Sequence, residues 1–332
     1  MDRHIEPIDP IEDYDAKGEE KMAEIMLEKI NSAVKDDLGE LIAREEAKYK
    51  AKITEVAERI DRDGVRVLLL AGPSGSGKTT TANLICDAIK SRGEECMVVS
   101  LDDFYRNSDD PDYPRLSDGN LDFECPEALC LDEIRATIEN IAHGRPFEIP
   151  KYNFKVGART YVKKYDVHAH ACVIIEGLHA LNTAICDGID TNNGVLKLFV
   201  SVSTNVNCEG ERLMSGRKAR FVRRLVRDSI YRNADAERTL RLWQNVLSAE
   251  DRYLYPYKKT ADMAFDTFHL YELSVMKPYV KELISDELAE KSGYAHAILA
   301  AMRRIETAPD DQIPADSLIR EFLPGGKYEH LY

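Results

Sequence analysis

The chain has 332 residues, 44% of them hydrophobic, and a formal net charge of −14. This length and composition suit one large domain with appendages, and the negative charge argues against a broad surface for nucleic acid. No apolar run approaches the length of a membrane span, no segment is typical of a signal peptide, and the seven cysteines contain no CxxC pair. We therefore expect a reduced, cytoplasmic protein that makes no membrane contact.

The first 62 residues precede the main pattern. Residues 1–16 are acidic and contain two prolines, which is typical of a disordered segment. Apolar residues at three- and four-residue steps predict a helical extension over residues 17–62, with a break at Gly39. These helices would either pack on the main domain or form an oligomer contact.

Residues 72–79 have the sequence GPSGSGKT, which fits the pattern G-x-x-x-x-G-K-[ST]. The apolar run 65–71 before it predicts a buried strand, and residues 80–91 after it predict a helix. In that context the glycines let backbone N–H groups surround a phosphate chain, while Lys78 reaches the β- and γ-phosphates and the Thr79 hydroxyl binds Mg²⁺. The alternative is a Gly/Ser turn before a helix. The predicted ATP-binding residues of this stretch are Gly72, Pro73, Ser74, Gly75, Ser76, Gly77, Lys78, Thr79 and Thr80.

Four further apolar runs predict strands, at residues 96–101, 171–175, 196–202 and 263–268. Carboxylates follow two of them: Asp102 and Asp103 after the first, and Glu176 after the second. Ligands of open α/β sheets bind beyond the carboxyl ends of the strands, so these positions suit chemistry, with Glu176 as a magnesium ligand. The alternative for Asp102 and Asp103 is a pair of exposed loop aspartates. The fold class predicted is α/β, a P-loop NTPase three-layer sandwich with a mainly parallel sheet.

The segments between these strands are more varied. Residues 106–127 predict a long loop, residues 126–143 a helix, and residues 150–165 an antiparallel hairpin. Later helices are predicted at 236–253, 270–288 and 295–305. We expect a main domain over residues 63–290 and a C-terminal helical appendage over residues 291–332.

Residues 211–232 carry eight basic and two acidic side chains. On a helix, Arg220, Arg223, Arg224 and Arg227 share one face, where like charges repel each other unless an anion binds. A polyphosphate fits this face, and the segment over about residues 208–235 is predicted to be an Arg-rich lid that closes over ATP. The alternatives are a solvated basic face and an RNA contact.

Taken together, the motifs GPSGSGKTTTA, LDDFY, DFECPEAL, IPKYNF, VIIEGLHAL, RRLVRD and ADMAFDTF occur in the order of one family. From about residue 65 to 280 the chain resembles the uridine kinase/phosphoribulokinase family of P-loop kinases. The stretches VRRLVRDSIYRNADAERTL, YELSVMKPYV and IPADSLIREF are similar to the kinase portion of bacterial nucleoside kinases that carry a TGS region. Here the N-terminal extension is too short to hold that region.

The resemblance implies a role for individual residues. Asp102 matches the general base, and Thr79 and Glu176 match the Mg²⁺ positions. The implied catalytic residues are Asp102, Lys78, Arg224 and Arg227. The implied substrate-binding residues are Asp102, Glu124, Tyr152 and Arg224, and Arg232 joins the residues that bind ATP.

The resemblance also implies ATP- and Mg²⁺-dependent phosphorylation of the 5′-hydroxyl of a nucleoside, giving a nucleoside monophosphate. Three positions that lie near the nucleobase in the family depart from its pattern in this sequence: Gly157, Ala234 and Leu242. The acceptor could therefore be a sugar, a polyol or a vitamin alcohol. Alternatives of another class are a regulatory P-loop ATPase and an RNA-associated protein. The expected partners are ATP, a small hydroxyl-bearing substrate and a second copy of the chain.

Overall fold

A computed structural model describes residues 23–116, 118–166, 172–187, 189 and 194–331. Its centre is a five-stranded parallel sheet in the order β10-β7-β2-β6-β3. The strands are β2 (Val67–Ala71), β3 (Cys96–Ser100), β6 (Cys172–Glu176), β7 (Val195–Ser201) and β10 (Met263–Asp266). The five strands predicted from the sequence are thus confirmed, with β2 in the middle of the sheet.

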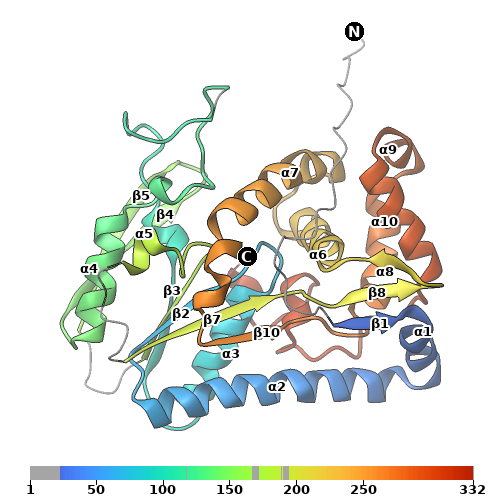
Figure 1. Cartoon of the computed structure of the whole chain (residues 1–332), viewed down its shortest axis with the longest axis horizontal. Helices are drawn as coiled ribbons and strands as arrows, with labels where there is room; N and C mark the ends of the chain where they lie inside the picture. The colour runs from blue at the N-terminus through green and yellow to red at the C-terminus, as the bar shows by residue number, and fades with distance from the viewer. Residues whose placement is uncertain (1–22, 117, 167–171, 188, 190–193, 332) are drawn as a thin grey trace.

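Helices cover both faces of this sheet (Figure 1). Side chains of a strand alternate between its faces, and β2 shows this clearly because Leu68 and Leu70 belong to one core, whereas Val67 and Leu69 belong to the other. The first core includes α2 (Leu38–Asp63), α3 (Lys78–Lys90), α6 (Gly216–Tyr231), α7 (Ala236–Tyr253) and α8 (Glu272–Leu283). The second core includes α4 (Leu131–Ala142) and α5 (Thr183–Cys186). The predicted three-layer α/β sandwich is confirmed.

The N-terminal extension consists of α1 (Leu27–Asp36) and α2, which runs along the length of the molecule in Figure 1. The predicted break at Gly39 is wrong by two residues. Asp37 lies between the helices, and its carboxylate accepts the Glu40 N–H at 2.9 Å, which is an N-cap that glycine cannot supply. Gly39 therefore lies inside α2. The segment 1–16, for which disorder was predicted, lies outside the described residues.

A second, smaller sheet joins this extension to the segment before α6. Strand β1 (Glu24–Met26) pairs in parallel with β8 (Asn205–Cys208), and β8 forms a hairpin with β9 (Glu211–Met214). The predicted lid segment therefore begins inside a hairpin. These strands of three or four residues carry too little alternation to be predicted from sequence.

Two predicted helices are shorter than expected. In the segment 126–143, Pro126–Ala128 forms a 3₁₀ turn and α4 starts only at Leu131. In the segment 270–288, α8 ends at Leu283, and Ser285 caps a separate helix α9 (Asp286–Lys291) through the Leu288 N–H. The predicted hairpin is confirmed as β4 (Phe147–Asn153) and β5 (Ala158–Tyr165), and the last helix is α10 (Gly293–Arg304).

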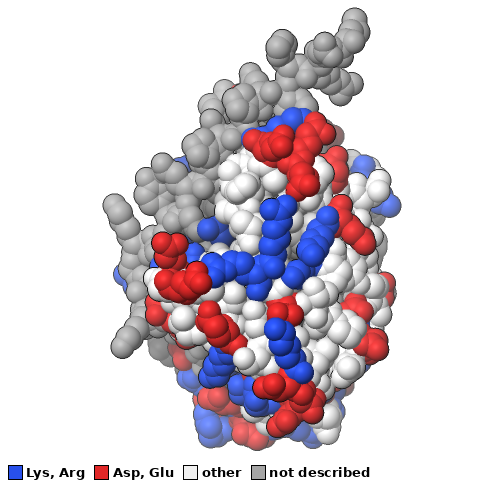
Figure 2. Space-filling model, turned by 90° about the vertical axis from the view of Figure 1, so that its right-hand side faces the viewer, with Lys and Arg blue, Asp and Glu red and all other residues white. Residues whose placement is uncertain are grey.

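Figure 2 shows the face on the side of α1, α9 and α10, where basic side chains alternate with acidic ones. Ion pairs join different elements there. Lys35 contacts Glu306 at 2.8 Å, and Arg304 contacts Glu209 at 2.8 Å. No helix among the described residues is long and apolar enough to cross a membrane.

Candidate active site

The phosphate loop, which we define as residues 72–77, connects the end of β2 to the start of α3 at the carboxyl edge of the sheet. Gly75 and Gly77 have φ values of +74° and +86°, a conformation that side-chain-bearing residues rarely adopt. At Gly72 a Cβ would lie 2.2 Å from the carbonyl oxygen of Val200 on the neighbouring strand. The Lys78 ammonium donates to the Pro73 carbonyl at 3.2 Å, so its side chain folds back over the loop.

A buried ion pair between α6 and α7 binds the backbone of the phosphate loop. Arg220 and Glu250 are both 0% exposed, and their side chains are 2.8 Å apart. Arg220 also donates to the Ser74 carbonyl at 2.8 Å, while Glu250 accepts the Ser74 N–H at 2.8 Å. The pair therefore binds both backbone groups of one loop residue.

A second buried pair repeats this arrangement one turn along α6. Arg223 and Glu272 of α8 are also 0% exposed and lie 2.7 Å apart. Arg223 donates to the Gly75 carbonyl at 3.2 Å, and the Thr267 hydroxyl, which Arg223 also contacts, donates to the Ser76 carbonyl at 2.8 Å. The expectation that the whole arginine face meets a polyphosphate is therefore wrong for Arg220 and Arg223, which are fully buried. Their partners are carboxylates from α7 and α8, which the pattern of one helix cannot reveal.

The remaining arginines of the predicted lid that were assigned to phosphate gather around one carboxylate, Asp228. Arg224, Arg227 and Arg232 lie 3.2, 2.7 and 3.5 Å from its oxygens. Arg224 also donates to the Ser74 hydroxyl at 2.9 Å, which places its guanidinium at the phosphate loop. Partial burial and the neighbouring Arg227 lower the pKa of Arg232 to about 10. Three guanidiniums around one carboxylate leave excess positive charge, which suits a phosphate group.

Two predicted carboxylates lie at the ends of adjacent strands. Glu176 ends β6 and is 5% exposed, and burial raises its pKa to about 7, with Lys78 acting in the opposite direction. Asp102 lies in the 3₁₀ turn after β3, with an exposed side chain. Although its surface is exposed, the protein atoms around the Asp102 carboxylate partly desolvate it and so raise its pKa, and again Lys78 opposes the shift. The structure therefore brings Lys78, Asp102 and Glu176 within electrostatic reach of one another.

Asp103 differs from its neighbour because it holds the β4–β5 hairpin. Its carboxylate pairs with Lys151 at 3.0 Å and accepts the Tyr152 N–H at 3.4 Å. Asp102 is therefore the member of the predicted pair that is left for chemistry.

Beyond Asp102 lies an aromatic cluster formed by Tyr105, Phe123, Tyr152 and Phe154. The ring of Tyr105 lies 5.5 Å from Tyr152, 6.0 Å from Phe123 and 5.6 Å from Phe154. Phe154 is 62% exposed and Phe123 is 38% exposed, so the cluster presents ring surface to solvent. Sequence reasoning assigned no role to Tyr105, Phe123 or Phe154. The available signal was their position, because each lies within three residues of a predicted site residue.

Glu124 is half-buried beside this cluster, and burial raises its pKa while Arg224 opposes the shift. Arg224, which contacts Ser74 of the phosphate loop, therefore also acts on the predicted substrate residue Glu124. On the far side of Tyr152, Gly157 has φ +69°, and a Cβ there would lie 2.4 Å from the Ser108 hydroxyl oxygen. That hydroxyl is 3.2 Å from the Tyr152 hydroxyl. Ser108 thus fills the space that a larger residue at 157 would need.

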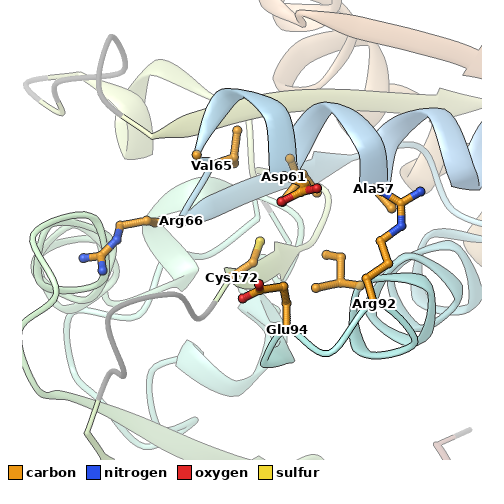
Figure 3. Close-up of a pocket in the computed structure, with 10 residues that line it drawn as sticks. Ala57, Asp61, Val65, Arg66, Arg92, Glu94 and Cys172 are labelled. Atoms are coloured by element: carbon orange, nitrogen blue, oxygen red, sulfur yellow. The ribbon is translucent and has the colours of Figure 1, made fainter.

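A cavity lies elsewhere, at the amino-terminal edge of the sheet (Figure 3). It has a volume of about 130 Å³, and its lining comes from the end of α2, the turn before β2, the end of α3 with the turn after it, and the first residue of β6. The side chains of Asp61, Arg92, Glu94 and Cys172 gather around it. None of the predicted site residues lines this cavity.

The side chain of His269 is buried behind the phosphate loop, and the pH dependence of stability tests this packing. Its Nδ1 lies 2.9 Å from the Thr267 carbonyl, and its Nε2 lies 3.8 Å from the Glu46 carboxylate. Burial, and then Arg223, lowers its pKa from 6.5 to about 3. The unfolded chain therefore binds a proton that the folded chain does not, so stability falls as the pH drops below 6.5. Glu46, whose pKa is raised by burial, contributes a slope of opposite sign.

We expect the free energy of unfolding of the wild type to fall more steeply with decreasing pH than that of His269→Gln. The difference in slope should rise from about 0.7 kcal/mol per pH unit at pH 6.5, where the unfolded histidine is half protonated, to about 1.4 kcal/mol per pH unit near pH 5. Glu46 is present in both proteins, so its effect largely cancels. Denaturant titrations at four or five pH values would measure this. Parallel slopes would show that His269 is not held neutral in the folded chain.

A strand, a glycine loop and a helix at the centre of a parallel sheet, with a carboxylate ending the adjacent strand, define a P-loop nucleotide-binding fold. The chain belongs to the Phosphoribulokinase / Uridine kinase family, whose model matches residues 67–274.

Individual relatives cover part of the chain. A uridine kinase from Saccharomyces cerevisiae is 29% identical over 198 residues, which span 59% of this chain and 36% of that protein. A uridine kinase from Halobacterium salinarum is 27% identical over 198 residues, 58% of this chain and 76% of that protein. An inorganic pyrophosphatase from Arabidopsis thaliana is 32% identical over 145 residues, 44% of this chain and 19% of that protein. The chain thus spans about a third of the yeast protein, and the names of its relatives differ in the reaction they state.

Proposed function

We propose that this chain transfers the γ-phosphoryl group of ATP to the 5′-hydroxyl of a nucleoside. The observation that carries the proposal is the position of Asp102. It lies in the 3₁₀ turn after β3, three residues before Tyr105 of the aromatic cluster, and at the same edge of the sheet as the phosphate loop that leads to Lys78. One exposed carboxylate is thus shared between a site for phosphates and a site for a flat acceptor.

The donor side is built for a polyphosphate. The glycine loop and the first amides of α3 supply backbone donors, and Lys78 supplies a positive charge beside them. Arg224 contacts Ser74 of the loop, and Arg227 and Arg232 lie around the same Asp228. These guanidiniums would stabilise the charge that develops on the transferred phosphoryl group.

The acceptor side suits a ring and a sugar. Phe123 and Phe154 offer exposed ring faces on which a base stacks. Glu124, whose pKa is influenced by Arg224, would accept hydrogen bonds from ribose hydroxyls. Asp102 would then accept the proton of the attacking 5′-hydroxyl, a role that needs it ionised.

The residues present also fit a magnesium ion. Mg²⁺ binds through one or two protein oxygens together with substrate phosphates and water, and Thr79 and Glu176 provide such oxygens. An ion there would favour the ionised form of Glu176, whose pKa burial raises to about 7. When bound, Mg²⁺ would neutralise charge on the β- and γ-phosphates. Among the described residues, no group of three or more His, Cys, Asp and Glu side chains forms a separate metal site.

A coupled assay of ADP release tests the proposal. The wild type is supplied with ATP, Mg²⁺ and, in turn, a panel of nucleosides, sugars and polyols, and the rate without acceptor is subtracted. We expect a nucleoside-dependent rate that falls by at least about 10²-fold in Lys78→Ala. Lys90→Ala is the matched control, because Lys90 ends the same helix and is exposed. Bound ATP with no acceptor-dependent rate would overturn the proposal and favour a regulatory ATPase.

A different alcohol is the second candidate, and the surroundings of Gly157 favour it. Ser108 occupies the space beside Gly157, and Leu242, another departing position, is 43% exposed on α7. These residues offer few groups that distinguish one base from another. A sugar or polyol rate above every nucleoside rate in the same panel would select this candidate.

A further inference from the structure

Residues 317–328, which we call the strap, pack against the phosphate loop and place one carboxylate beside the start of α3. Side-chain contacts with α2 and α3 hold the two ends of the strap. The Ser317 hydroxyl donates to Glu46 of α2 at 2.6 Å. At the other end, Lys327 and Tyr328 both contact the Asp87 carboxylate of α3, at 2.5 and 2.6 Å.

Between these ends the strap packs against the nucleotide-binding motif. A Cβ on Gly77 would lie 2.5 Å from Leu318, which is 0% exposed. The ring of Phe322 lies 5.1 Å from the guanidinium of Arg223, and the Leu323 carbonyl accepts the Tyr231 hydroxyl at 3.0 Å. The strap is therefore a packed part of the molecule rather than a loose tail.

The one acidic residue of the strap is Glu321, and its side chain points to the start of α3. Glu321 is 5% exposed, and its Oε2 accepts the backbone N–H of Thr80 at 3.3 Å. The first backbone bond inside the helix comes one residue later, from the Thr81 N–H to the Gly77 carbonyl at 2.9 Å. The Thr80 N–H thus precedes the first backbone bond inside the helix and donates to Glu321, at the helix end where the dipole favours an anion.

The first amides of this helix are those that a P-loop offers to the phosphates of a nucleotide. A carboxylate and a phosphate cannot share one N–H, and two anions this close repel each other in a partly buried site. We propose that Glu321 is an internal competitor for the phosphate site, held there by the strap, and that nucleotide binding displaces it. This inference rests on the proposed function to the extent that the loop binds a nucleotide.

The test is the affinity of the full chain for ADP with Mg²⁺, measured by titration calorimetry. Glu321→Gln keeps an acceptor for Thr80 but removes the charge, and Glu321→Ala removes both. We expect both variants to bind ADP more tightly than the wild type, by about tenfold, since one charge-assisted hydrogen bond no longer has to break. Glu329→Gln is the matched control, because Glu329 accepts the Gly325 N–H at 3.1 Å and is exposed.

A second variant loosens the strap without touching the loop. Tyr328→Phe removes the hydroxyl that contacts Asp87, and we expect it to tighten ADP binding as well, by a smaller factor. Hydrogen exchange gives an independent readout, in which amides of residues 318–323 should exchange faster when ADP is bound to the wild type.

The outcomes separate this inference from the proposed function. Unchanged or weaker ADP binding in both Glu321 variants, with ADP bound by the wild type, overturns the competitor role alone. Weaker binding would make Glu321 a contact of the nucleotide instead. No ADP binding by the wild type or by any variant overturns the proposed function together with the inference. Binding only after Glu321 is replaced supports the inference in its strongest form.

Discussion

Replacing Asp102 with asparagine is expected to lower acceptor-dependent turnover by about 10²- to 10⁴-fold, the usual contribution of a general base. Asparagine keeps the size and the hydrogen-bonding capacity of the side chain but cannot take the proton of the acceptor hydroxyl. ADP affinity should stay close to that of the wild type or rise slightly, because one negative charge near Lys78 is lost. Steady-state kinetics with the best acceptor, beside calorimetry with ADP, would measure both quantities.

Asp103→Asn is the control for this experiment. Asp103 pairs with Lys151 and accepts the Tyr152 N–H, so its replacement should loosen the β4–β5 hairpin and raise the KM of the acceptor. The turnover number at saturating acceptor should change much less than in Asp102→Asn. If Asp102→Asn turned over normally while Asp103→Asn did not, the base would be Asp103.

The second large effect is on stability, at the buried pair of Arg223 and Glu272. Glu272→Ala is expected to lower the free energy of unfolding by about 3–5 kcal/mol, because it leaves a fully buried guanidinium without its carboxylate. Arg223 also binds the Gly75 carbonyl, so ADP binding should weaken in the fraction that stays folded. Chemical denaturation followed by circular dichroism would measure the loss.

Two comparisons show whether burial of the charge causes the loss of stability in Glu272→Ala. Arg241→Ala breaks a pair with Glu237 on the surface of α7, and it should cost only about 0.3–0.5 kcal/mol. The double variant Arg223→Met, Glu272→Met leaves no unpaired charge and should be more stable than Glu272→Ala alone. Equal losses for Glu272→Ala and Arg241→Ala would contradict the role assigned to the buried pair.

The parts of the fold that the sequence predicts are those that depend on local pattern. Strand β2 is a continuous apolar run followed by glycines, and the four other strands of the sheet have the same character. Asp102 and Glu176 could be placed at one edge because the carboxyl ends of parallel strands meet there. No long-range partner had to be known for these inferences.

The parts that were missed depend on partners far away in the sequence. Four arginines look alike on one face of α6: Arg220, Arg223, Arg224 and Arg227. Two of them nevertheless pair with carboxylates of other helices, Arg220 with Glu250 and Arg223 with Glu272. Only tertiary contacts separate the structural members from those proposed to bind phosphate. The strap is a similar case, because nothing in residues 317–328 indicates that they lie on a motif some 240 positions earlier.

Local chemistry explains the smaller errors. The break in the N-terminal helices is set by the capping carboxylate of Asp37 rather than by the flexibility of Gly39. The three-residue strand β1 contains too few residues to show a period of two.

The most direct measurement is the identity of the product. The wild type is incubated with ATP, Mg²⁺ and uridine, and in parallel with 5′-deoxyuridine, and the products are analysed by mass spectrometry and phosphorus NMR. We expect uridine to gain one phosphoryl group at its 5′-oxygen, with one ADP formed per product, and 5′-deoxyuridine to gain none. Formation of ADP and free phosphate with no phosphorylated nucleoside from any member of the panel would contradict the proposed kinase activity.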